Sequence, residues 1–105
     1  MSRVEIRRDH AAEQDLRDQY CFYEEHDIDL AERFLDAVEE TCSILATQPR
    51  MGSPRHFAAP ELVGVRFLPV AGFPRHLIFY TVGDEALTIV RVLHASRDLP
   101  LLLDG

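Results

Sequence analysis

Apolar and polar residues recur with one period before residue 60 and with another after it. Between Asp9 and Gln48 apolar residues return every three or four positions, which is typical of amphipathic α-helices. We expect one helix from Asp9, a plausible N-cap, to about His26. A second should end at Gln48, because the residue before a proline is disfavoured in a helix. The expected buried stripes are Ala12, Leu16, Tyr20 and Tyr23 in the first helix, and Ala31, Phe34, Leu35, Val38, Cys42 and Leu45 in the second.

Two shorter signals complete the N-terminal half. Asp29, with Glu32 three positions later, has the spacing of a capping box and predicts the start of the second helix. Before the first helix, Val4 and Ile6 alternate with charged residues, which predicts a short strand. The pattern does not reveal the partner of this strand.

Three apolar runs of strand length follow residue 60. Residues 63–67 alternate, residues 76–82 are almost continuously apolar, and residues 87–93 are rich in β-branched side chains. The continuous run is typical of a central strand that is covered on both faces. Because only residues 71–74 and 83–85 connect the runs, we expect an antiparallel β-meander. Residues 51–60 are expected to form a loop.

These elements predict an α+β fold of one domain spanning residues 1–105. An antiparallel helical hairpin with one apolar face would pack on the antiparallel meander sheet, and the short N-terminal strand would join that sheet. An apolar fraction of 47% with 28% charged residues argues against disorder. No apolar run approaches the ~20 residues that span a bilayer, and the first residues lack a signal-peptide core. We therefore expect a cytoplasmic protein without a membrane partner.

Charge is distributed unevenly around a net value of −7. Between Asp9 and Glu40, twelve acidic residues face two arginines, a balance of −10, whereas residues 41–105 carry +1. Nucleic-acid binders usually present a basic face, which the helical half cannot supply. The sheet half could supply one with Arg50, Arg55, Arg66, Arg75, Arg91 and Arg97. All eleven cations are arginines, so mechanisms that need a lysine are excluded. We expect no sequence-specific binding of nucleic acid by this chain.

Candidate chemistry gathers at the end of the last predicted strand. His94 and Arg97 could serve as an acid/base pair and a phosphate clamp on RNA. Alternatively, Arg97 and Asp98 pair locally or cap the strand end, with His94 half-buried. Arg66 and Arg91 interrupt apolar runs, and a buried arginine must be paired. Arg66, Arg75 and Arg91 either pair with acidic side chains of the helical half or Glu61, or project toward a protein partner.

No cofactor or metal site is expected. Cys21 and Cys42 fall on the two antiparallel helices, too far apart for a disulfide, and are predicted to be free thiols. No catalytic set, phosphate-binding glycine loop or converging group of metal ligands emerges. The histidines that show no pair at metal-ligand spacing are His10, His26, His56, His76 and His94.

An apolar tail closes the chain. Leu99 and residues 101–103 surround Pro100. They could fold back on the free face of the sheet, or form part of a groove that a partner's helix or strand fills.

The order of several short motifs resembles the ParE family of bacterial toxins, within the RelE/ParE superfamily. In the second half these motifs are EL-x-G-x-R at 61–66, V-x-GF at 70–73, HLIFY at 76–80 and I-x-RVLH-x-x-RDL at 89–99. In the first half they are DL-x-x-x-Y at 15–20, LA-x-RF-x-x-A at 30–37 and P-x-x-G-x-x-R at 49–55. The resemblance spans about residues 4–100. It implies the same arrangement, a helical hairpin on one face of a sheet.

The resemblance also implies a function. A ParE-like protein is expected to be the toxin of a type II toxin–antitoxin pair, to poison DNA gyrase, and to be held inactive by a ParD-like antitoxin. Such a protein is a binding inhibitor and not an enzyme. Two alternatives stay open: a ribosome-dependent messenger-RNA endoribonuclease of the RelE type, and a non-toxic relative that only binds antitoxin. From strand position and charge, the expected partner-contact residues are Arg66, Arg75, Arg91, His94 and Arg97.

Overall fold

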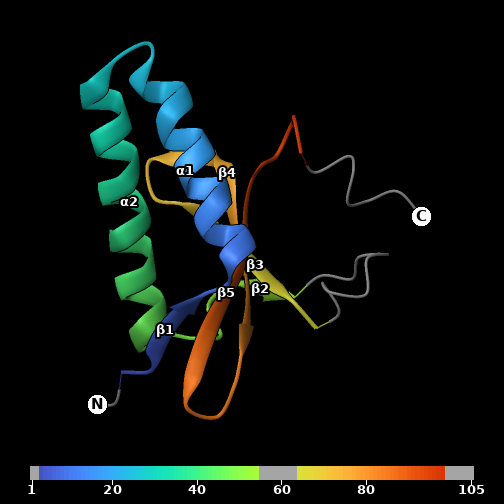
Figure 1. Ribbon diagram of the computed structural model, residues 1–105. Helices are drawn as coiled ribbons and strands as arrows, with labels where there is room; N and C mark the ends of the chain where they lie inside the picture. Colours follow the sequence, from blue (N-terminus) through green and yellow to red (C-terminus); the bar gives the residue numbers. More distant parts are fainter. Residues whose placement is uncertain (1–2, 55–63, 99–105) are drawn as a thin grey trace.

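Two helices and five strands make up the protein in the computed structural model, which describes residues 3–54 and 64–98 (Figure 1). Their order confirms the predicted α+β class, with a short N-terminal strand, a helical hairpin and then the meander. The elements are β1 (Glu5–Arg8), α1 (His10–Glu24), α2 (Ile28–Thr47), β2 (Ser53–Pro54), β3 (Arg66–Val70), β4 (Phe73–Val82) and β5 (Ala86–His94).

The sheet has the strand order β1-β5-β4-β3-β2. Strands β3, β4 and β5 form the predicted antiparallel meander, whereas β1 pairs in parallel with β5 over Ala86 to Ile89. The sheet is therefore mixed, because β1 enters it next to the last strand. The expectation of a loop from residue 51 was wrong at Ser53 and Pro54, which pair with Phe67 and Arg66 as the edge strand β2. The rest of that expected loop, residues 55–60, lies outside the described residues.

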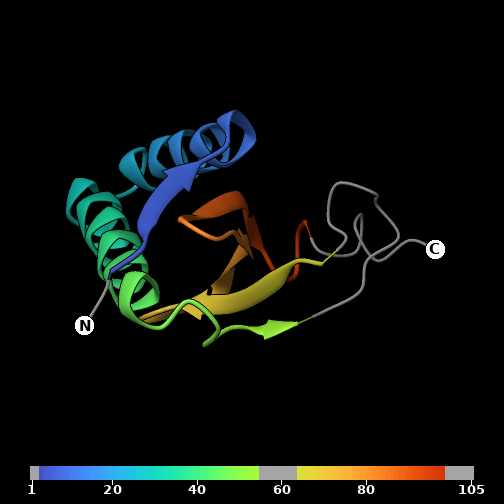
Figure 2. The same ribbon diagram turned by 90° about the horizontal axis from the view of Figure 1, so that it is seen from below.

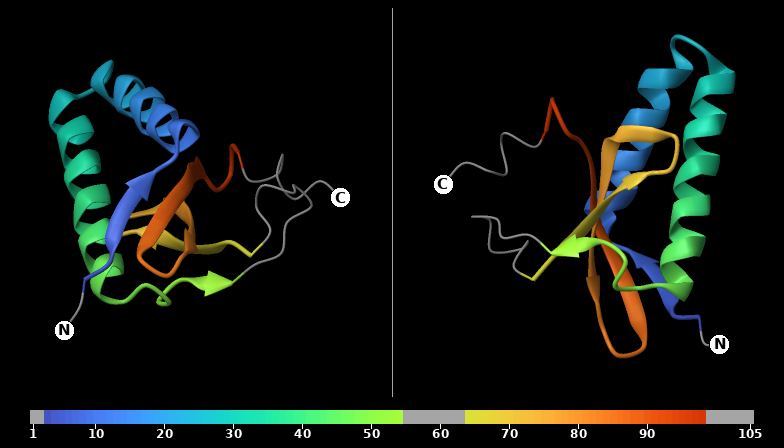
Figure 3. Two further views of the ribbon diagram at one scale, coloured as in Figure 1. Left: turned by 60° about the horizontal axis from the view of Figure 1, so that its bottom comes forward. Right: turned by 180° about the vertical axis from the view of Figure 1, so that it is seen from behind.

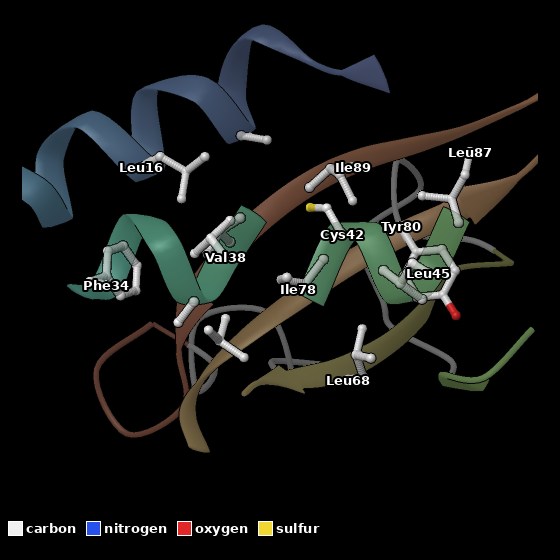
Figure 4. Close-up of a cluster of buried hydrophobic side chains, with 14 residues drawn as sticks. Leu16, Phe34, Val38, Cys42, Leu45, Leu68, Ile78, Tyr80, Leu87 and Ile89 are labelled. Atoms are coloured by element: carbon white, nitrogen blue, oxygen red, sulfur yellow. The ribbon is translucent and has the colours of Figure 1, made fainter. Parts of the chain in front are cut away.

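Both helices cover the same face of the sheet, as Figures 2 and 3 show. The main core lies between these two layers (Figure 4). Phe34, Val38 and Leu45 project from α2 and are almost fully buried, which confirms the predicted stripe of this helix. From the sheet, Ile78, Tyr80, Leu87 and Ile89 meet them, and Leu16 joins from α1. Cys42 is buried in this core and Cys21 is exposed, and both are free thiols, as expected.

A second buried cluster occupies the opposite face of the sheet. It contains Val65, Leu77, Phe79 and Leu93. Strand β4 thus sends buried side chains to both faces, as its continuous apolar run predicted. The expected role of Leu99 and residues 101–103 on this face concerns residues outside those that the structure describes.

The helix starts differ from the capping pattern in the sequence. Asp27, and not Asp29, is the N-cap of α2, since its carboxylate accepts hydrogen bonds from Asp29 N at 2.9 Å and Leu30 N at 3.4 Å. These amides are the second and third of the helix, the donors that an N-cap side chain reaches. Asp9 holds the N-cap position of α1, but its side chain makes no capping bond. In α1 the buried polar residue is Gln19, whereas Tyr20 lies at the edge of the stripe.

The turn between β3 and β4 is shorter than expected. Only Ala71 and Gly72 separate the strands, and Gly72 has a φ of +82°, which favours glycine. Pro74 lies within β4, although a proline there was expected to break the run. The β3–β4 register passes from Val70↔Phe73 to Pro69↔Leu77, so Pro74 faces no ladder partner and its missing N–H is tolerated.

Candidate functional site at the end of β5

The last residues of β5 lie against α1, beyond the point where β1 ends. Arg91 donates from Nε to Asp15 Oδ2 at 2.8 Å and from Nη2 to Asp15 Oδ1 at 3.0 Å. The backbone N–H of Val92 donates to Asp15 Oδ2 at 3.0 Å. Two residues on, the N–H of His94 donates to Asp98 Oδ2 at 2.9 Å. Carboxylates therefore close this edge of the sheet, and an added strand would have to displace them.

A histidine cluster lies at the same end of the sheet. His76 on β4 is only 3% exposed, and its Nε2 shares a hydrogen bond of 2.7 Å with the hydroxyl of Tyr23 on α1. The ring of His94, its cross-strand neighbour, lies edge-on with centroids 5.1 Å apart. Burial lowers the pKa of His76 to about 4, aided by His94 and Arg97 and opposed by Asp98. His76 is therefore neutral at pH 7 and enclosed by its neighbours.

Arg97 lies between the carboxylates at the edge of β5 and the histidine cluster. Its Nη2 donates to Gln19 Oε1 at 2.8 Å, and its Nε lies 3.4 Å from Asp98 Oδ1. On one side of it is a cavity of about 420 Å³ between α1 and β5, and near His94 is a second cavity of about 240 Å³. The larger cavity is lined by Asp15, Asp18, Gln19, Phe22, Arg91, Val92, Leu93, Arg97 and Asp98. The smaller is lined by Tyr23, Gly72, Phe73, Pro74, Arg75, His76 and His94.

Four of the five residues expected to contact a partner meet at this end of the sheet. Arg91 and Arg97 line the larger cavity, and Arg75 and His94 line the smaller one. Arg66 lies apart from them on β3, where it donates to the carbonyl oxygens of Gly52 at 2.7 Å and Arg50 at 3.3 Å. Of the two sequence interpretations for Arg91, pairing with an acidic residue of the helical half is the one observed.

Sequence reasoning offered an acidic partner for Arg91 in the helical half, but it did not identify the α1 residues of this site. Asp15 and Gln19 were not considered as partners of the β5 arginines, and Tyr23 was assigned only to the buried stripe. Gln19 did carry a usable signal, because it lies three residues after Leu16 and four before Tyr23, in line with the apolar stripe. Nothing local in the sequence marks Asp15, whose partner Arg91 is 76 positions away.

The described part of the chain holds no group of three or more His, Cys, Asp or Glu side chains arranged as a metal site requires. Burial raises the pKa of the Cys42 thiol, although Arg8 acts against this, so Cys42 is a protonated core residue. Among the described helices, none is both long and apolar enough to cross a bilayer.

A helical hairpin on one face of a mixed five-stranded sheet, with the first strand beside the last, places the chain in the α+β class. The model of the ParE toxin of the type II toxin–antitoxin system parDE matches residues 6–99. The chain therefore belongs to the ParE toxin family of type II toxin–antitoxin systems.

The fold is also found in a solved structure. A chain from the structure of the chromosomal ParDE toxin–antitoxin system of P. aeruginosa superposes with a TM-score of 0.70 and 20% sequence identity. The match covers 87% of the present chain and 95% of that chain. No curated protein matches the chain. The structural similarity supports the fold, and the match to the family model shows that the chain belongs to the ParE toxin family.

Proposed function

We propose that this chain is a cytoplasmic toxin that binds and inhibits DNA gyrase and is neutralised by a ParD-like antitoxin. The observation that carries the proposal is the family match over residues 6–99. The structurally similar P. aeruginosa chain belongs to a chromosomal ParDE toxin–antitoxin system, which supports an antitoxin partner for the present chain.

The site favours binding over catalysis. A general acid or base must reach its substrate and change its protonation state near neutral pH. His76 is enclosed and has a pKa of about 4, while Arg91 and Arg97 are engaged by Asp15, Gln19 and Asp98. A net charge of −7 also opposes binding to RNA, because affinity for RNA rests on the neutralisation of phosphates. These features support a binding inhibitor, and the proposal needs no cofactor.

The experiment is pulse-labelling of DNA and protein synthesis just after induction of the chain alone in a bacterial host. Early loss of DNA synthesis with continuing translation is expected. Early loss of translation would instead support the RelE-type endoribonuclease. If neither falls while the folded protein accumulates, the chain is a non-toxic relative in that host. Inhibition of DNA supercoiling by purified gyrase in the presence of the purified chain tests the target directly.

The proposed contact residues are tested with a matched pair of variants. Arg75→Ala removes an exposed arginine of the smaller cavity that has no ion pair within the described residues. Arg17→Ala removes an exposed arginine of α1, away from that cavity. We expect both variants to fold, and Arg75→Ala alone to lose toxicity. Equal toxicity of the two would remove Arg75 from the proposed contact surface.

A further inference from the structure

The smaller cavity beside His94 has the size and the walls of a site for one side chain. Its volume of about 240 Å³ lies below the roughly 300–1,000 Å³ of sites for drug-sized molecules. Phe73 and Tyr23, whose rings pack against each other with centroids 6.3 Å apart, line the cavity with aromatic surface, and Pro74 adds another apolar surface. Such walls favour an occupant with apolar atoms behind its polar end.

The polar groups of the cavity favour a negative charge. Arg75 is exposed, and within the described residues its guanidinium has no ion pair. His94 is engaged at Nδ1 by Ser96 Oγ at 3.1 Å, which leaves Nε2 for a ligand. The positive charge of Arg97 also acts on this cavity. It helps to lower the pKa of His76, and it lowers the pKa of Tyr23, which burial raises. Asp98 opposes these cations, but it already accepts from the His94 N–H and pairs with Arg97.

The structure assigns to this cavity the recognition of a carboxylate side chain, Asp or Glu, that a protein partner presents beside an apolar residue. An arginine fork binds a carboxylate through two parallel hydrogen bonds, and the aromatic rings offer apolar surface to the atoms behind the carboxylate. A nucleic acid fits less well, because its many phosphates would approach a chain of net charge −7 whose segment from Asp9 to Glu40 carries −10. A single carboxylate on a protein avoids most of that repulsion.

This inference rests on the proposed function only for the identity of the protein that supplies the carboxylate. The binding itself belongs to the isolated chain and can be measured without gyrase or antitoxin. If the chain binds carboxylates but leaves DNA synthesis intact, the proposed function fails alone. If it stops DNA synthesis but binds no carboxylate, the inference fails alone.

The test is a chemical-shift titration of the isotopically labelled full chain with sodium benzoate, benzamide and inorganic phosphate in parallel. Benzoate combines an apolar ring with a carboxylate, benzamide is its neutral counterpart, and phosphate represents nucleic-acid backbone. We expect saturable shifts of the His94 ring and of the Gly72 amide with benzoate, and much weaker ones with the other two. Equal binding of benzamide would mean an apolar slot, and stronger binding of phosphate would mean a general anion site. Either result, or no saturable shift with benzoate, overturns the proposal.

Two variants keep the assignment specific. Arg75→Gln should weaken benzoate binding about tenfold, as loss of a charge-assisted hydrogen-bond pair does. His94→Asn, which keeps a polar group of smaller size, should weaken it less. Arg17→Gln is the matched control and should leave the affinity unchanged. If Arg75→Gln retains its thermal midpoint and binds benzoate as tightly as the parent chain, Arg75 does not hold the carboxylate and the proposal fails.

Discussion

Gly52 occupies a position where no side chain fits. A Cβ built there would lie 2.5 Å from the hydroxyl oxygen of Tyr80 and 2.8 Å from the carbonyl oxygen of Phe67. The same backbone segment is held by hydrogen bonds from Gly52 N to Tyr80 Oη at 2.8 Å and from Arg66 to Gly52 O. Glycine is therefore required here by close packing against a buried tyrosine, and not by an unusual backbone angle.

Substitution of Gly52 by alanine should therefore destabilise the protein. Because Tyr80 is fully buried and the Phe67 contact is to backbone, neither neighbour can move freely. We expect Gly52→Ala to lower the free energy of unfolding by about 1–3 kcal/mol, as overpacking in a well-packed core does. Urea denaturation measures this, with the exposed neighbour Ser53→Ala as the control. A Gly52→Ala protein as stable as the Ser53→Ala protein would show that the segment around Gly52 has room for a methyl group.

His76 makes stability depend on pH in a defined window. Its pKa is about 4 in the folded protein and ~6.5 in an unfolded chain, so the folded state binds the proton less well. Above pH 6.5 both states are neutral and the contribution is fully present. As the pH falls from 6.5 toward 4, the unfolded state takes up the proton and stability is lost, by up to about 3 kcal/mol. The groups packed around His76 are Tyr23, His94, Arg97 and Asp98.

The contribution of His76 to the pH dependence of stability is separated from that of the carboxylates by comparing the parent chain with a His76 variant. Unfolding free energies of the parent chain and of His76→Gln are measured from pH 8 to pH 4. We expect the advantage of the parent over His76→Gln to shrink as the pH falls through this window. Exposed His10→Gln serves as the control for loss of an imidazole from the surface. A constant difference for His76→Gln would mean that His76 titrates normally.

At the scale of elements, the sequence predicted the helices and strands whose pattern of apolar residues is local. The stripe of Phe34, Val38 and Leu45 identified α2 because helix periodicity is a local property. The continuous run of residues 76–82 likewise identified β4 as a strand buried on both faces. The parallel pairing of β1 with β5 could not be predicted, since it joins residues 5–8 to residues 86–89. Strand β2 was missed because two residues carry no alternation.

The residues of the candidate site likewise fall into those that the sequence identified and those that only the fold brings together. His94 and Arg97 were identified because charged residues at the end of an apolar strand stand out locally. Their functional neighbours Asp15, Gln19 and Tyr23 come from α1, and only the packing of the hairpin on the sheet brings them there. The choice of Asp29 as the helix cap was wrong for a related reason. Asp27 and Asp29 are both favourable N-cap residues, and only Asp29 has a glutamate three positions later, so the local pattern favoured the wrong one.

The start of α2 provides a test of that correction. Asp27→Ala removes the acceptor of the Asp29 and Leu30 amides and should lower the free energy of unfolding by about 1 kcal/mol. Asp29→Ala is the matched control, because it removes an acidic side chain from the first turn but leaves the cap in place. Thermal unfolding of the two variants under the same conditions measures the difference. If Asp29→Ala is the more destabilised, the capping box of the sequence pattern holds after all.

At the scale of the whole molecule, the acidic hairpin is joined to the sheet by charged contacts. Arg8 of β1 pairs with Glu39 of α2, and Arg91 of β5 pairs with Asp15 of α1. The second contact is the more shielded at its acidic end, where the Asp15 side chain is 15% exposed. Asp15 also accepts the Val92 N–H, so one carboxylate both neutralises an arginine and closes the open edge of β5.

Asp15 should therefore matter more for stability than its surface position suggests. Asp15→Ala leaves both the Arg91 guanidinium and the Val92 N–H without this acceptor, and we expect it to lower the free energy of unfolding by about 2 kcal/mol. Asp15→Asn keeps an acceptor for one donor but loses the charge, and should fall between Asp15→Ala and the parent. Asp18→Ala, one turn along on the same helix, is the control and should stay within about 0.5 kcal/mol. Hydrogen exchange at the Val92 amide adds a local readout, because opening of this edge should speed exchange in Asp15→Ala and less in Asp15→Asn. Unchanged exchange in Asp15→Ala would mean that another group protects this edge.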